Sequence, residues 1–107
     1  MKHLKHYEKY HYENINAQIG DYVIIDPYTH PKEVENWILN NIGQIIDIEN
    51  YDTYIVKYEN IPTGWEDHFS YNDEQKNIRK TQKSGIKHIS KNKEELELII
   101  SQNKYNL

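Results

Sequence analysis

Hydrophobic and polar residues alternate most clearly in two segments in the middle of the chain, 42–48 and 53–59. Both are rich in β-branched and aromatic residues, and a short polar stretch separates them. Successive side chains of a strand point to opposite sides, so Tyr54 and Val56 share one face while Ile55 lies on the other. The pattern predicts a β-hairpin with one buried face and one face toward solvent.

Shorter patterns predict three more strands around this hairpin. A first strand region ends near Asp26, where Pro27 stops it, and Gly20 with Asp21 marks a bend before it. Brief strands are expected at 77–80 and 86–89.

Two helices are expected, at 29–41 and 92–103. In the first, apolar residues follow helical i, i+3, i+4 spacing, and they are Val34, Trp37 and Ile38. The second begins with Asn92 followed by Glu95, the spacing of a capping box. Residues 1–14 lack a continuous apolar face and are expected to form an N-terminal arm ahead of a single domain at 15–107.

Short strands, one tight hairpin, two long connections and a terminal helix predict a mainly β protein with a small five-stranded barrel. The segments Gly20-Asp21-Tyr22-Val23, Ile42-Gly43-Gln44-Ile45 and Tyr54-Ile55-Val56-Lys57-Tyr58 resemble Src-homology-3-like barrels of the KOW type. The resemblance covers about residues 15–90. It implies such a barrel with an inserted short helix and a C-terminal helix, in a fold whose members bind proteins or nucleic acids.

The amino-acid composition indicates the genomic background of the coding sequence. Ile, Asn, Lys and Tyr dominate, and Arg79 is the only arginine, a bias typical of AT-rich coding sequence. The chain also resembles uncharacterised small proteins of low-GC bacteria and their phages or mobile elements. Without cysteine or a long apolar segment, we expect a cytoplasmic protein of such a host, with no membrane association.

Charge is divided unevenly along the chain. Residues 10–74 carry thirteen acidic side chains and two lysines, whereas residues 75–93 carry seven basic side chains and no acid. The two blocks either neutralise each other in the fold or form separate faces that attract different partners.

The acidic block predicts an acidic, aromatic surface that binds a basic protein, since Tyr and Trp are favoured at interfaces. We expect this partner to be a host protein that handles nucleic acid or a CRISPR-type defence complex, which the protein would inhibit. The expected contact residues are Tyr51, Asp52, Trp65, Glu66, Asp67, Phe69, Tyr71, Asp73 and Glu74.

The alternative is a KOW-like barrel that binds RNA or DNA through its basic strip at 76–93. Its contact residues would be Lys76, Arg79, Lys80, Lys83 and Lys87. The acidic isoelectric point of about 5.8 and the single arginine favour protein binding.

Catalytic and metal chemistry find little support in the sequence. Histidines such as His3 and His6, and the run from Glu66 to His68, lack the spacing of known ligand motifs. The serines lie in no nucleophile elbow, and the glycines are too scattered to cradle a phosphate. We therefore expect no catalytic residue, no metal and no cofactor.

Overall fold

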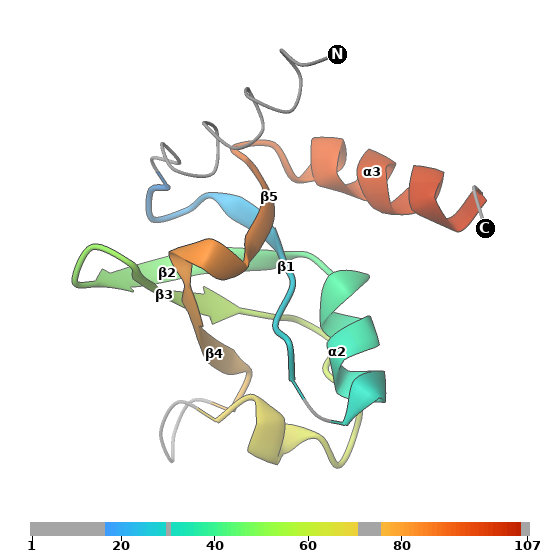
Figure 1. Cartoon of the computed structure of the whole chain (residues 1–107), viewed down its shortest axis with the longest axis horizontal. Coiled ribbons are helices and arrows are strands. Elements are labelled where there is room, and N and C mark those ends of the chain that lie inside the picture. The colour runs from blue at the N-terminus through green and yellow to red at the C-terminus, as the bar shows by residue number, and fades with distance from the viewer. Residues whose placement is uncertain (1–16, 30, 71–75, 106–107) are drawn as a thin grey trace.

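The structure is a computed structural model that describes residues 17–29, 31–70 and 76–105. Figure 1 shows a curved sheet with α2 beside it and α3 extending from one end. In chain order the elements are β1 (Tyr22–Ile25), α2 (Lys32–Leu39), β2 (Gly43–Glu49), β3 (Thr53–Lys57), the 3-10 helix η1 (Glu66–His68), β4 (Ile78–Gln82), the 3-10 helix η2 (Lys83–Gly85), β5 (Ile86–Ser90) and α3 (Lys93–Tyr105).

The predicted strands and helices are confirmed, with boundaries that differ by a few residues. All strand pairs are antiparallel, and the order across the sheet is β4-β3-β2-β1-β5. The predicted hairpin β2–β3 is confirmed, and in the sheet it lies between β4 on one side and β1 on the other. The N-terminal arm at 1–14 lies outside the described residues.

The sheet is strongly curved. β4 and β5 lie at opposite ends of the strand order, yet only the three residues of η2 connect them. In a flat sheet the end strands would be about 19 Å apart, since neighbouring strands lie about 4.8 Å apart. The four Cα steps from Gln82 to Ile86 span at most about 14 Å. The sheet must bend to bring these strand ends together.

Two hydrogen bonds fix η2 in place. The backbone N–H of Lys83 donates to the carbonyl oxygen of Asp52 at 2.8 Å, and the N–H of Asp26 donates to the carbonyl oxygen of Gly85 at 2.8 Å. The short connection therefore ties the tip of the β2–β3 hairpin to the end of β1.

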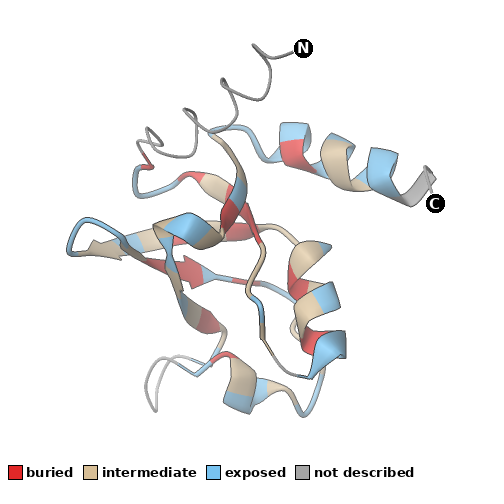
Figure 2. Ribbon diagram, viewed as in Figure 1, coloured by how far each residue is buried: buried red, intermediate tan, exposed pale blue. Residues whose placement is uncertain are grey.

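The concave side of the sheet carries the main core, in which Tyr54, Val56 and Tyr58 of the β3 region pack with Val34 and Ile38 of α2. Figure 2 shows buried residues concentrated on the strands and on the side of α2 that faces them. Gly43 begins β2 beneath this layer, and a Cβ atom there would overlap Val56 Cγ1. Close approach of β2 and β3 thus requires glycine at this position.

The other face of β3 was expected to face solvent, and at Ile55 this expectation is wrong. Ile55 is 2% exposed, although it lies on the face opposite Tyr54 and Val56. It pairs directly with Lys80 of β4. An ion pair between Lys80 and Glu49 of β2 crosses β3 on this face. Lys80 and Glu49 thus lie on the same face of the sheet as Ile55, where the aliphatic stem of a lysine can cover an apolar neighbour.

α3 docks on β1 and β5, and its Leu96 side chain is fully buried there. Half of the predicted capping box forms, because Asn92 Oδ1 accepts the backbone N–H of Glu94 at 3.0 Å. The backbone N–H of Asn92 itself donates to Ser90 Oγ at 2.9 Å, so the reciprocal bond to Glu95 is replaced by one to β5. The start of α3 is thereby fixed to the sheet.

Candidate functional site

The acidic residues Glu66 and Asp67 lie on η1 beside an aromatic pair. Trp65 precedes η1, and its ring meets the ring of Trp37 on α2 edge to face, with 6.3 Å between ring centroids. Both tryptophans are half-buried and pack on the core. The turn that leads to Trp65 contains Gly64 at φ +92°, a conformation that favours glycine. The fold thus joins η1 and α2, which are far apart in the sequence.

The carboxylates on this surface face solvent. Glu66 and Asp67 are exposed, and neither forms an ion pair with another described residue. Glu33 is also exposed and lies one helical turn before Trp37, on the same side of α2. We call Glu33, Trp37, Trp65, Glu66 and Asp67 the α2–η1 surface. It combines unpaired negative charge with the edges of large aromatic rings.

Phe69, which the sequence suggested as a partner contact, lies in the core instead. It is fully buried and packs edge to face on Trp37 and Tyr58 at ring-centroid distances of 5.5 and 5.6 Å. The guanidinium of Arg79 lies over its ring at 5.7 Å, within the range of a cation–π contact. Burial lowers the pKa of Arg79, while the nearby Tyr58 raises it. Phe69 therefore supports the surface from beneath.

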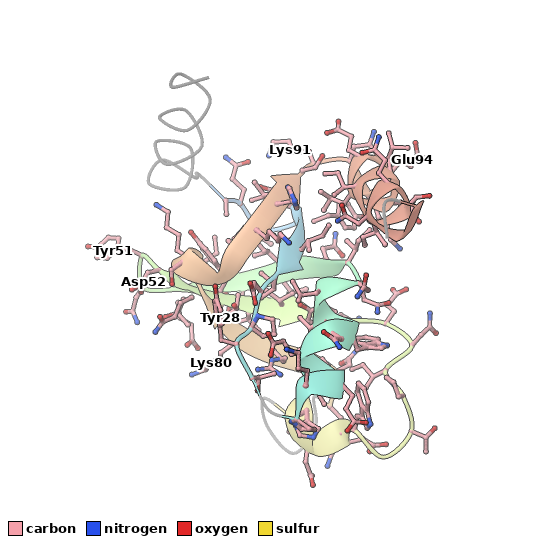
Figure 3. All side chains as sticks on the ribbon, turned by 45° about the vertical axis from the view of Figure 1, so that its right-hand side comes forward. Tyr28, Tyr51, Asp52, Lys80, Lys91 and Glu94 are labelled. Carbon is pink, nitrogen blue, oxygen red and sulfur yellow. The ribbon has the colours of Figure 1, made fainter. Side chains whose placement is uncertain are left out.

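The hairpin tip forms a separate site. Tyr51 is 95% exposed, and Asp52 beside it is exposed too. Figure 1 shows that this tip and η1 lie at different ends of the molecule. In Figure 3 the tip projects on the opposite side from Glu94 on α3. The predicted contact residues are therefore divided between two places. Those at Tyr71, Asp73 and Glu74 lie outside the described residues.

The basic strip does not form one continuous face within the described part of the chain. Arg79 and Lys80 are neighbours on β4, so their side chains point to opposite sides of the sheet. Arg79 lies over Phe69 on the core side, whereas Lys80 Nζ is 3.2 Å from Glu49 Oε1 on the outer side. The other predicted contact residues of the strip are Lys76 before β4, Lys83 on η2 and Lys87 on β5.

A second contact joins the charge blocks near the start of β1. Lys91 Nζ is 3.1 Å from Asp21 Oδ1 and 2.9 Å from the side-chain oxygen of Gln18. Asp21 is buried, and its other carboxylate oxygen accepts the backbone N–H of Gln18 at 2.9 Å. The two blocks therefore neutralise each other at Asp21 and at Glu49, while the acids of the α2–η1 surface stay unpaired.

Sequence reasoning missed a group of residues at the end of β1. Asp26 and Tyr28 line a groove of about 260 Å³ together with residues of β4 and η2. Tyr28 is 81% exposed and has a φ of +46°. The Asp-Pro-Tyr sequence could have indicated an aromatic residue presented by a turn. The groove itself forms because the curved sheet brings β4 and η2 next to Asp26 and Tyr28, and residue patterns do not show this curvature.

The described residues include no group of three His, Cys, Asp or Glu side chains placed to hold a metal ion. In the same part of the chain, no helix has the length and apolarity needed to cross a membrane. Comparisons of the chain with protein-family models, curated proteins and solved structures found no match.

Proposed function

We propose that this chain is a non-enzymatic binding protein whose α2–η1 surface binds a basic protein. The observation that carries the proposal is the contrast between Glu66 and Asp67, which have no ion pair among the described residues, and Glu49, which pairs with Lys80. Unpaired exposed charge beside half-buried tryptophan suits an interface, because aromatic anchors supply buried area and charges around them steer the partner.

We further propose that the curved sheet closes into a Src-homology-3-like barrel. The support is the strand order β4-β3-β2-β1-β5 and the three-residue connection η2, which brings the two end strands together at one point. Small barrels of this kind serve many functions, so the fold gives a scaffold and the surface residues give the function.

The narrower proposal is that the partner is a nucleic-acid-handling or CRISPR-type defence complex of a low-GC bacterial host, which this protein inhibits. It rests on the AT-rich coding bias, the small size and the acidic block. Complexes that hold nucleic acid expose basic channels, and an acidic surface can compete for them.

The test is capture of partners from a low-GC bacterial lysate on immobilised protein, with and without nuclease. We expect nuclease-resistant capture of a basic protein, lost when Glu66→Lys and Asp67→Lys are combined. The matched control combines Glu94→Lys with Glu97→Lys on α3, which makes the same change in net charge at exposed positions.

Two results would go against the proposal. Equal capture by both double variants would show that binding does not depend on the α2–η1 surface. Capture abolished by nuclease and by neutralising Lys76, Lys83 and Lys87 would favour the nucleic-acid alternative, in which binding also weakens steeply with salt.

A further inference from the structure

Arg79 is the only arginine of the chain, and its charge has no anionic partner among the described residues. Its guanidinium lies over the Phe69 ring at 5.7 Å, and it forms no hydrogen bond or ion pair within the described part of the chain. A guanidinium carries several N–H donors, and a ring face leaves most of them without an oxygen acceptor. Arg79 is therefore able to bind an anion from outside the fold.

The surroundings of Arg79 make an unpartnered charge unfavourable. The residue is half-buried on β4, and burial lowers the pKa of its guanidinium because the charged form loses water. A charged donor that has lost part of its water gains more from an added acceptor than one in bulk solvent. Among the described residues one side-chain polar atom is both buried and unpartnered, Asp26 Oδ1, so the guanidinium nitrogens of Arg79 stay within reach of solvent. A ligand can supply the missing acceptor.

Arg79 lines the groove of about 260 Å³ between the end of β1 and the β4–η2 connection. Arg79 and Thr81 are two residues apart on β4, so both side chains lie on the same face of the sheet. Thr81 lines the groove as well, and so does Ser84 on η2, and each hydroxyl group can donate a hydrogen bond. The β4–η2 side of the groove is therefore rich in donors.

The charges along the groove indicate which kind of anion it suits. Lys80 also lines the groove, but it pairs with Glu49. Asp26 is the one carboxylate of the lining, and it forms no ion pair with Arg79 or with any other described residue. One guanidinium compensates one negative charge, so a carboxylate can lose water here, whereas a doubly charged phosphate would keep an uncompensated charge. The fork of a guanidinium also matches the two oxygens of a carboxylate.

We propose that this groove binds a single carboxylate group, with Arg79 donating to its oxygens and the hydroxyl groups of Thr81 and Ser84 adding donors beside it. The exposed ring of Tyr28 covers the aliphatic part of the ligand at the edge of the groove. The groove volume accommodates one acidic side chain or a small carboxylic acid and not a folded element. The inference goes beyond the proposed function, because the groove and the α2–η1 surface have no residue in common.

The test uses the full-length protein and a short blocked peptide, Gly-Glu-Gly, followed by NMR spectra. Because the chain has one arginine, the side-chain Nε–H of Arg79 gives a single signal. We expect this signal to shift together with the backbone amides of Thr81, Ser84 and Gly85. The peptide Gly-Gln-Gly is neutral at nearly the same shape, and it should bind at least about tenfold more weakly, since charged hydrogen bonds are lost.

Variants at Arg79 separate charge from geometry. Arg79→Met keeps an unbranched, polarizable side chain over Phe69 and should weaken glutamate-peptide binding at least about tenfold while the protein stays folded. Arg79→Lys keeps the charge without the fork and should bind with intermediate affinity. Lys93→Met, at an exposed residue of α3, makes the same change in net charge as Arg79→Met and should leave binding unchanged.

Acetate and inorganic phosphate distinguish the sources of the anion. Tighter binding of the glutamate peptide than of acetate assigns the carboxylate to a protein side chain, and acetate that binds at least as tightly assigns it to a small acid. Equal binding of the glutamine peptide, unchanged binding by Arg79→Met, or phosphate that binds more tightly than both carboxylates would overturn the inference.

Discussion

Lys80 Nζ lies 3.2 Å from Glu49 Oε1, and the ion pair crosses β3 on the face that carries Ile55. One residue belongs to the basic block of the sequence and the other to the acidic block. The contact therefore neutralises part of each block, and it lies on the same face of the sheet as the buried Ile55. We expect this ion pair to contribute to packing over Ile55 as well as to charge balance.

Substitutions at Lys80 should separate these two roles. Lys80→Ala removes both the charge and the stem over Ile55, whereas Lys80→Met keeps an unbranched stem. We expect Lys80→Ala to lower the free energy of unfolding by about 1 kcal/mol, and Lys80→Met and Glu49→Gln to lower it less, because exposed ion pairs contribute little. Urea unfolding measures the difference. Equal losses for alanine and methionine would show that the stem is unimportant.

Asp21 should matter more for stability than its partner Lys91. The carboxylate is buried and accepts the Gln18 N–H, whereas the Lys91 side chain is 75% exposed. Asp21→Ala removes a buried acceptor and leaves the partly buried Gln18 N–H without its partner, which is expected to cost about 1–3 kcal/mol. Lys91→Ala is the control and should cost less than about 1 kcal/mol. Similar losses at both positions, measured by chemical denaturation, would contradict the structural role of the buried carboxylate.

Near η1, the aromatic Phe69 should contribute to the stability of the fold, and the acidic Glu66 and Asp67 should contribute to partner binding. Phe69→Ala removes a fully buried ring beneath Arg79 and should destabilise the fold by about 3–5 kcal/mol. Glu66→Gln and Asp67→Gln, at exposed positions, should change the thermal midpoint little but weaken partner capture. A stable Phe69→Ala variant would show that Phe69 is not in the core.

Alkaline pH should destabilise the protein through Tyr58. Burial raises the pKa of its phenol well above the ordinary value. Burial also raises the pKa of Tyr54, and the negative charge of the nearby Asp52 adds to this effect. Above about pH 10 the unfolded chain releases these protons while the folded chain keeps them, so the free energy of unfolding falls as pH rises.

Tyr58→Phe should reduce this alkaline loss, measured by urea unfolding from pH 9 to about pH 11.5. Tyr51→Phe, at the exposed hairpin tip, is the matched control. A Tyr58→Phe variant that loses stability with pH as steeply as the unmodified protein would exclude Tyr58 as the cause.

Regular elements were predictable because their residues repeat with strand or helix period. The α2 residues Val34 and Ile38 face the core as their spacing indicates, and the hairpin strands pair where alternation predicts them. The expected solvent face was wrong at Ile55, because this residue is buried on a strand that lies between β2 and β4, and single-strand alternation does not show the strand order.

The candidate site was predictable only in part. Glu66, Asp67 and Trp65 lie together because they are adjacent in sequence. Their proximity to Trp37 requires the fold. Phe69 could not be assigned to the core in advance, since the loop around it has no period. Asp26 and Tyr28 acquire their groove only when the curved sheet brings η2 against the end of β1.

The most direct test of the account is the affinity of the purified captured partner for three forms of the protein, measured by calorimetry at fixed salt. The forms are the unmodified chain, the double reversal at Glu66 and Asp67, and the control reversal at Glu94 and Glu97. We predict that reversal on η1 weakens binding by at least about tenfold, while the α3 control stays within about twofold of the unmodified protein. Equal affinity of all three forms would contradict the assignment of binding to the α2–η1 surface.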